Sequence, residues 1–305
     1  MANKHASLDA LFTDIADAIR EKTGDTTTIV ADDFPDVIRE RLQVIPPPPA
    51  YLTFSSPSSF TLKVNDATKH WDGTLEYSTD ASAWSTWDGT TTLSSVTSGS
   101  DNVLYLRGTG NTVITGDIQS YKWVLTGSDI ACIGDIDTLL DYTTVEAGNH
   151  PPLSDYCYEY MFYGCTGLTQ APALPATTLT SYCYQNMFRG CTSLTQAPAL
   201  PATMLSPNCY RSMFRDCTSL TQAPALPATT LADYCYQNMF RGCTSLKLSS
   251  TQTGEYTVAY RIPTAGNGTT ATNALSNMFD STGGTFTGAP EINTTYYLSN
   301  TNTVV

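Results

Sequence analysis

Apolar and polar residues alternate with a period of two over residues 51–125, in runs such as "YLTFSS", "FTLKVND" and "VLYLRGTG". Gly, Asn, Asp and Ser lie between the runs. Short alternating runs separated by turn residues are typical of half-buried antiparallel strands. The pattern therefore predicts a small antiparallel β-sandwich over residues 51–128.

A second pattern has a period of 26 residues and fills residues 156–246 with four copies, one of which reads "YCYQNMFRGCTSLTQAPALPATML". If residues 182–191 form a helix, then Cys183, Met187 and Cys191 share one apolar stripe. The prolines of "LTQAPALP" keep the segment that follows extended. One such unit cannot enclose a core, so the pattern predicts units that stack as a solenoid.

The N-terminal pattern is helical. "SLDALFTDIADAIREKTG" and "DFPDVIRERLQ" have apolar residues at helical spacing, which predicts a helical leader over residues 1–45. Two short helices cannot bury their apolar faces alone, so we expect them to pack on another copy or a partner, or to fold back on the same chain. Four consecutive prolines make residues 46–50 a stiff polyproline linker.

The ends of the repeat block depart from its consensus. Residues 129–155 predict an N-terminal cap of the solenoid, because terminal repeats are often atypical. Residues 247–305 predict an inserted hairpin, "GEYTVAYRIPTAGNG", and a degenerate capping repeat that begins with "NMFDSTGG". The predicted fold class is thus α+β and multidomain: helical leader, small antiparallel β-sandwich, solenoid and C-terminal cap.

Composition narrows the classes of function. The 305 residues have a net charge of −13 and only 14% of them are charged, without the basic cluster that a nucleic-acid surface needs. There is no apolar run of 18 residues, so we expect no membrane insertion. The first residues have no apolar core of a signal peptide, so we expect synthesis in a cytoplasm without export by general secretion.

The cysteines are the candidate chemistry of the repeats. Eight of the nine fall in four pairs eight residues apart: Cys157, Cys165, Cys183, Cys191, Cys209, Cys217, Cys235 and Cys243. On a helix that spacing is about 12 Å along the axis, beyond the roughly 7 Å that a disulfide spans between Cα atoms. Zinc sites commonly pair cysteines two to four residues apart, and that spacing does not occur here. The interpretation is two rows of reduced, packed thiols, with cross-rung disulfides and metal binding as less favoured alternatives.

Catalytic motifs are absent from the sequence. The three histidines lie in different segments and none recurs with a Cys or Ser partner. Four near-identical cysteine sites are a poor way to build one active site. We therefore predict no catalytic residues, no metal and no cofactor, and a protein that is not an enzyme.

Two stretches resemble known families. "MFRGCTSLTQAPALPATTLADYCYQNMF" resembles the BspA-like leucine-rich repeats, a 26-residue repeat of bacterial surface proteins. That resemblance implies a leucine-rich-repeat solenoid and a role in adhesion or recognition. "LFTDIADAIREKTGDTTTIVADDFPDVIRERL" is similar to the helical leader of phage and prophage tail proteins, which implies attachment to other virion tail proteins through residues 1–45.

The copies differ from one another mainly at positions that the helix would turn outward. The candidate binding residues are Tyr163, Gln185, Asn186, Arg189, Arg211, Arg215 and Arg241. Arginines in a row could hold anionic glycans or acidic protein through bidentate hydrogen bonds. The alternatives are that exposed positions simply drift, or that the nearly invariant "TQAPALPAT" face binds the ligand.

The sequence therefore predicts a phage or prophage tail or fibre-type structural protein, located in the virion, that binds a host cell-surface glycan or protein. The alternatives are a bacterial cell-surface adhesin and a purely architectural virion protein. A homo-oligomer, such as the trimer expected of a fibre, stays open.

Overall fold

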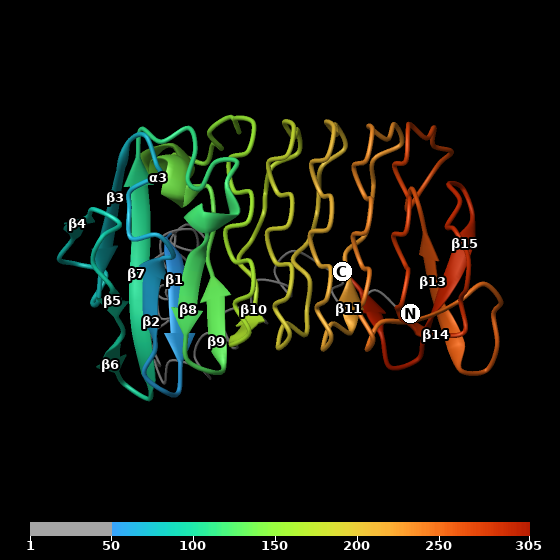
Figure 1. Ribbon diagram of the computed structural model, residues 1–305, viewed down its shortest axis with the longest axis horizontal. Coiled ribbons are helices and arrows are strands. Elements are labelled where there is room, and N and C mark those ends of the chain that lie inside the picture. The colour runs from blue at the N-terminus through green and yellow to red at the C-terminus, as the bar shows by residue number, and fades with distance from the viewer. Residues whose placement is uncertain (1–50) are drawn as a thin grey trace, which may run out of the picture. The chain divides into compact units, whose positions relative to one another are not determined.

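The computed structural model describes residues 51–305 (Figure 1). The predicted helical leader at residues 1–45 and the polyproline linker at 46–50 lie outside the described residues.

The region of period-two runs contains β1 to β8 of two sheets, and β9 follows it within the predicted N-terminal cap. Their bounds are β1 (Leu52–Ser56), β2 (Thr61–Val64), β3 (Thr74–Ser78), β4 (Ser85–Trp87), β5 (Leu93–Ser94), β6 (Val96–Ser98), β7 (Asp101–Thr109), β8 (Trp123–Thr126) and β9 (Ile130–Ile133). One sheet has the order β10-β9-β1-β7-β3-β4, with β6 also on β7, and the other has the order β5-β2-β8. Apolar residues that alternate along these strands, such as Leu52, Phe54 and Leu62, are fully buried.

A short helical segment leads from the sheets into the repeats. The 3-10 turn η2 (Gln119–Tyr121) precedes β8, and α3 (Thr138–Glu146) follows β9 and packs on β7. The larger sheet extends into the first repeat, because β10 (Leu168–Gln170) pairs in parallel with β9. One hydrophobic cluster runs from the sheets through the repeats.

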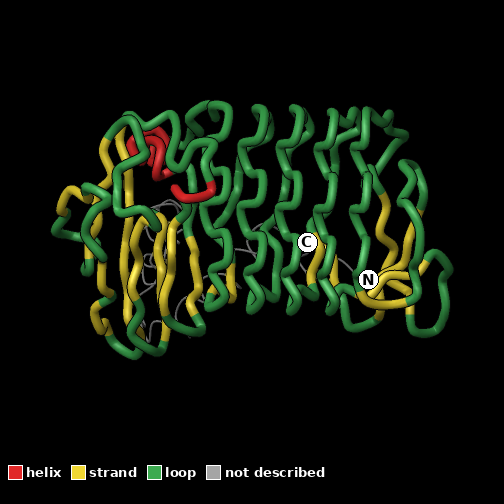
Figure 2. Tube along the Cα trace, in the orientation of Figure 1, coloured by secondary structure: helices red, strands yellow, loops and turns green. Residues whose placement is uncertain are grey.

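Each 26-residue repeat forms one coil of chain, and the first half of the coil is a succession of four-residue turns (Figure 2). The backbone enters the left-handed region at every fourth residue, as at Tyr182 (φ 63°), Asn186 (φ 55°) and Gly190 (φ 76°). Side chains disfavour that region, and a right-handed helix contains no such residues in its interior. The helix predicted over residues 182–191 is therefore wrong.

The predicted fold class is wrong for the same reason. Strands are the main regular elements, and α3 is the one α-helix within residues 51–305. An α+β architecture with a leucine-rich-repeat solenoid conflicts with this content. We refer to the coils built from residues 156–246, together with their continuation to residue 281, as the coil stack.

The backbone N–H groups of the turns donate hydrogen bonds both within a coil and to the next coil. From residue 182 to 190, even-numbered residues donate to the next coil; the Phe188 N–H, for example, donates to the Met213 carbonyl at 3.0 Å. From 185 to 191, odd-numbered residues donate three residues back, as Cys191 does to Phe188 at 3.0 Å. Since half of these N–H groups bond within the coil and half between coils, register between neighbours is set residue by residue.

The second half of each coil is extended. Parallel bridges join Gln170 to Gln196 and Gln196 to Gln222. The last of these glutamines begins β11 (Gln222–Ala223), which pairs with β16 (Thr303–Val304) near the end of the chain.

The C-terminal segment closes the coil stack with a second small sheet of order β13-β15-β12-β14. Its strands are β12 (Lys247–Ser249), β13 (Tyr256–Arg261), β14 (Gly283–Gly284) and β15 (Thr295–Ser299). The predicted local hairpin is wrong: β13 pairs with β15, more than thirty residues later in the chain. Met278 and Phe279 continue the buried Met and Phe positions of the repeats, because Phe240 donates to the Met278 carbonyl and its ring stacks on Phe279.

Two rows of aromatic rings run through the core of the coil stack. The tyrosine row stacks nearly parallel with centroids 5.7 to 5.9 Å apart, and the phenylalanine row with centroids 5.6 to 5.9 Å apart. The rows consist of Tyr158, Tyr184, Tyr210 and Tyr236, and of Phe162, Phe188, Phe214, Phe240 and Phe279. Full burial of one such ring contributes about 1.5–3 kcal/mol, so the rows are a main source of cohesion between coils.

Among residues 51–305, no helix has the length and apolar character needed to cross a bilayer.

Candidate functional site

Four of the predicted binding residues occupy one position in successive coils. We call Tyr163, Arg189, Arg215 and Arg241 the arginine row. The carbonyl of each arginine accepts a hydrogen bond of 2.8 Å from the preceding coil, donated by Gly164, Gly190 and Asp216 in turn. Because register is set in this way, the four side chains leave the coil stack side by side on one face.

Two carboxylates accompany the row. Asp216 Oδ2 lies 3.7 Å from Arg189 Nε and 3.4 Å from Arg215 Nε, and Asp280 Oδ2 lies 3.1 Å from Arg241 Nε. The arginine side chains keep 28%, 28% and 39% of their surface exposed. Surface pairs of this length contribute little to stability, roughly 0–1 kcal/mol each.

An aromatic group and a lysine extend the row at its N-terminal end. The Tyr163 ring lies under the Arg189 guanidinium at 5.4 Å and under Lys122 Nζ at 4.9 Å. The extended row thus has four cationic groups against two carboxylates, Asp216 and Asp280, an excess of two positive charges.

In each ion pair, Nε is the arginine atom that lies 3.1 to 3.7 Å from the carboxylate. Within residues 51–305, the terminal Nη atoms of Arg189, Arg215 and Arg241 form no hydrogen bond. These Nη atoms form the planar fork that recognises carboxylate, sulfate or phosphate groups. The row therefore has three partly exposed guanidinium groups whose Nη donors form no hydrogen bond within residues 51–305.

The other three predicted binding residues do not belong to this row. Gln185 and Asn186 were expected to face outward, but they are only 8% and 6% exposed. The Gln185 amide donates to the Glu159 carboxylate in the preceding coil, and Asn186 holds a left-handed turn position. Arg211 occupies the same position as Gln185, one coil later in the chain. Its guanidinium is 6.0 Å from the Tyr234 ring and donates to Asn208 Oδ1 at 3.3 Å.

Glu159 varies between copies, with Gln185 at the same position of the next coil, and was expected to face outward, but it is a buried carboxyl group. Its side chain is 2% exposed, and burial raises its pKa to about 8 despite the hydrogen bond from Gln185. At neutral pH this group is mostly protonated, so the coil stack avoids burying a charge at this position.

The eight paired cysteines line the inside of the coil stack as two rows, and all nine cysteines are free and buried. In the second row the thiols of Cys191, Cys217 and Cys243 donate to the Phe carbonyl of the preceding coil at 3.0 to 3.1 Å. Burial raises the pKa of these thiols, for Cys165 to about 11. Because the thiolate is the nucleophile and metal ligand, such thiols are poor candidates for either role.

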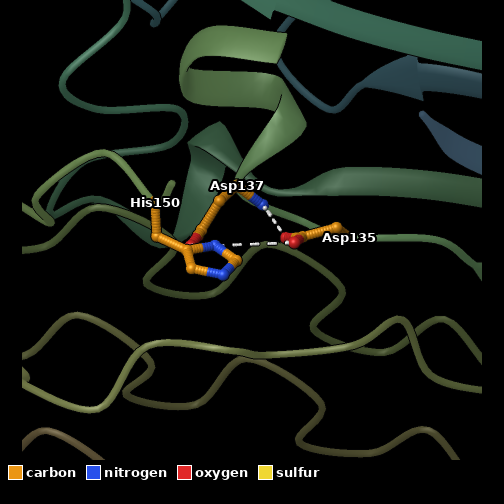
Figure 3. A group of neighbouring side chains, drawn as sticks. All are labelled: Asp135, Asp137 and His150. Atoms are coloured by element: carbon orange, nitrogen blue, oxygen red, sulfur yellow. Dashed lines mark hydrogen bonds and ion pairs between the residues drawn. The ribbon is translucent and has the colours of Figure 1, made fainter. Parts of the chain in front are cut away.

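One group of side chains was missed in the sequence. Asp135 and Asp137 precede α3, His150 follows it, and the three side chains converge (Figure 3). The "DID" spacing places both carboxylates at one turn, but nothing in the sequence indicates that a histidine in the loop after α3 returns to them.

Comparison with family models, with curated proteins and with solved structures found no match for this chain.

Proposed function

We propose that this chain is a non-catalytic binding protein of the virion, of tail or fibre type, whose arginine row binds an anionic glycan of the host cell surface. The observation that carries the proposal is the set of three adjacent, partly exposed arginines whose Nη atoms form no hydrogen bond within residues 51–305.

The charge distribution supports the choice of an anionic ligand. The chain as a whole has a net charge of −13, so an excess of positive charge on one face of the coil stack runs against its overall balance. Long-range repulsion from the rest of the protein lowers the association rate of an acidic ligand, and a local cationic row compensates for it only at short range. The ligand that fits is a polymer with repeated acidic groups that meets several arginines at once.

The repeat spacing supports a polymeric ligand. Buried rings of successive coils lie 5.6 to 5.9 Å apart, and the arginines follow the same coils. A glycan bearing one acid group on each residue or each second residue can place its charges along such a row, so several weak contacts add to one binding event.

The test is binding of the full chain to immobilised acidic and neutral polysaccharides and to intact bacterial cells, with the triple variant R189Q/R215Q/R241Q. Hydrogen bonds to charged groups contribute about 1.5–3 kcal/mol, so loss of even one engaged fork weakens binding at least tenfold. The matched control K63Q/K69Q/K247Q removes the same number of positive charges from exposed lysines elsewhere. Equal loss in both triple variants would show a general charge effect and refute the arginine row as the site.

The assignment to a virion is supported by the similarity of residues 1–45 to tail-protein leaders and is tested separately. Particles released on lysis of the producing bacterium are purified and analysed for this chain by mass spectrometry. Its presence in the particle agrees with the proposal, and its confinement to the envelope of living cells favours an adhesin instead.

A further inference from the structure

Asp135, Asp137 and His150 lie at the junction between the sheets and the first coil. Asp135 and Asp137 belong to the turn that links β9 to α3, and His150 lies in the loop that leads from α3 to the coil stack (Figure 3). Within residues 51–305, this is the one group of three potential ligands whose atoms lie within 4.8 Å of one another.

The distances inside the group do not fit ordinary hydrogen bonds. His150 Nδ1 is 3.4 Å from Asp137 Oδ2 and 3.6 Å from Asp135 Oδ2. Charge-assisted hydrogen bonds between nitrogen and carboxylate are about 2.7–2.9 Å long. His70 shows that normal case, with Nε2 2.9 Å from both oxygens of Asp66.

The same distances fit atoms that share a metal ion. Zinc binds imidazole nitrogen at about 2.0–2.1 Å and carboxylate oxygen at about 2.0–2.2 Å, and tetrahedral angles then separate two ligand atoms by roughly 3.4 Å. Both nitrogen–oxygen separations lie close to that value. Three ligand atoms leave a fourth position for water or another group.

The remaining oxygens are already held by the protein. Asp135 Oδ1 accepts the N–H of Asp137 at 2.9 Å, and Asp137 Oδ1 accepts the Tyr158 hydroxyl at 3.3 Å. Each carboxylate therefore has one oxygen fixed by a donor and turns the other, Oδ2, toward His150. Outer hydrogen bonds of this kind orient carboxylate and imidazole ligands in metal sites.

A second observation also indicates that a cation can bind here. The Asp137 side chain is 0% exposed, and its Oδ2 has no hydrogen-bond partner. Buried carboxylate oxygens are almost always paired with a donor or a metal, because an unpaired one costs several kcal/mol. This oxygen is aimed at the space that it shares with Asp135 and His150.

We propose that Asp135 Oδ2, Asp137 Oδ2 and His150 Nδ1 bind one divalent transition-metal ion of the zinc class. The donor set of one imidazole and two carboxylates suits zinc better than calcium or magnesium, which prefer oxygen ligands alone. The ion fastens the loop after α3 to the turn before it, beside Tyr158, the first ring of the tyrosine row. From the sequence we predicted no metal, so this proposal departs from that prediction, and the site is separate from the arginine row.

The test uses the full chain, freed of metal with a chelator and titrated with zinc chloride by calorimetry and by thermal unfolding. We expect one zinc ion per chain at the site and a higher unfolding temperature with zinc than with chelator. Because His150 is 45% exposed, H150A removes a ligand without disturbing the core, and it should weaken binding by more than the about 10–100-fold typical of outer-shell changes. The matched variant H70A should bind as the original chain does.

Two further measurements keep the proposal falsifiable. Y158F removes the hydroxyl that lies 3.3 Å from Asp137 Oδ1 and 3.2 Å from the Ile136 carbonyl, and because Asp137 then loses its donor it should weaken zinc binding about tenfold or more. With cobalt in place of zinc, visible absorption should show tetrahedral coordination without the charge-transfer band of thiolate ligands. Absence of binding, equal binding by H150A, or a thiolate band would each overturn the proposal.

Discussion

Replacing Asn186 and Asn238 by alanine or by glycine distinguishes the observed turns from the helix that the sequence pattern favoured. Both residues have a φ of 55° at the same position of coils that lie two repeats apart. In such a turn glycine should be the better residue, because it has no Cβ to oppose left-handed backbone. In a helix alanine would be better, because glycine has the lower helix propensity.

The test depends on which variant, glycine or alanine, has the higher free energy of unfolding, and the size of that difference can be estimated. A side chain in the left-handed region costs roughly 1–2 kcal/mol, while glycine loses about 0.5–1 kcal/mol through its more flexible unfolded chain. The net preference for glycine over alanine is therefore about 1 kcal/mol at each turn position. A helix would instead favour alanine by about 1 kcal/mol. Comparing the two variants with each other cancels the loss of the asparagine amide.

The assay is urea unfolding of N186A/N238A against N186G/N238G, followed by tryptophan and tyrosine fluorescence. The two sites share no partner, so their effects should add to about 2 kcal/mol in favour of the glycine pair. Gln237 provides the matched control, since it precedes Asn238 and has no left-handed backbone. Q237A should be more stable than Q237G. If alanine is also the more stable residue at 186 and 238, the turn geometry is wrong.

Three further predictions concern the interior of the coil stack. Burial raises the pKa of Glu159 from 4.5 to about 8, so as pH rises the unfolded chain loses this proton before the folded chain does. The free energy of unfolding should therefore fall between these two pH values, by up to about 1.4 kcal/mol per pH unit. E159Q, which places the Gln185 side chain in the first coil, should remove that part of the pH dependence, and E291Q at an exposed carboxylate should retain it. If the free energy of unfolding fell equally steeply with pH in both variants, Glu159 would not be the group responsible. The nine buried thiols should react with an aromatic disulfide reagent at least about 100-fold more slowly in the folded chain than in urea, and rapid reaction of the folded chain would mean that the thiols are accessible. F214A, which removes a buried ring stacked at 5.7 and 5.8 Å on its neighbours, should cost about 3–5 kcal/mol in urea unfolding, and a loss under 1 kcal/mol would show that the phenylalanine row contributes little.

The strands of the N-terminal sheets could be located from the sequence because their signal is local. Runs such as "FTLKVND" bury every second residue, and Leu62 and Val64 on β2 are both fully buried. Their pairing could not be read in the same way. β1 lies between β7 and β9, and β13 pairs with β15, since partners are chosen by packing across the fold and not by proximity in the chain.

The repeat length could also be predicted, but the conformation inside the repeat could not be read from apolar spacing alone. Cys183, Met187 and Cys191 are four residues apart, which lies close to the helical period of 3.6 over so short a stretch. The information that separates the two conformations is at the turn positions. Asn186 and Gly190 are residues that tolerate left-handed backbone, and Asn, Ser, Asp and Gly recur there in the other copies, apart from Tyr160 in the first.

That turn geometry explains why two predicted binding residues are structural. On a helix, Gln185 and Asn186 would project to solvent between apolar stripes. In the four-residue turns they pack against the same positions of neighbouring coils, which leaves them less than 10% exposed. Variation between copies at these sites therefore reflects contacts between coils, such as Gln185 with Glu159, as much as contacts with a ligand.

The arginine row differs from these sites because its backbone is fixed while its side chains are free. Main-chain hydrogen bonds alone hold position 163 and its equivalents, so any residue except proline can stand there without a change of register. The chain places Tyr163 first, then three arginines, and then Asp280 in the last coil, where it pairs with Arg241. A substitution in this row should thus alter the charge pattern of the surface and leave stability nearly unchanged, since the pairs it disturbs are exposed and weak. Main-chain atoms of the turn stabilise the coil stack, whereas the proposed recognition rests on side-chain atoms, which is why the two can be tested independently.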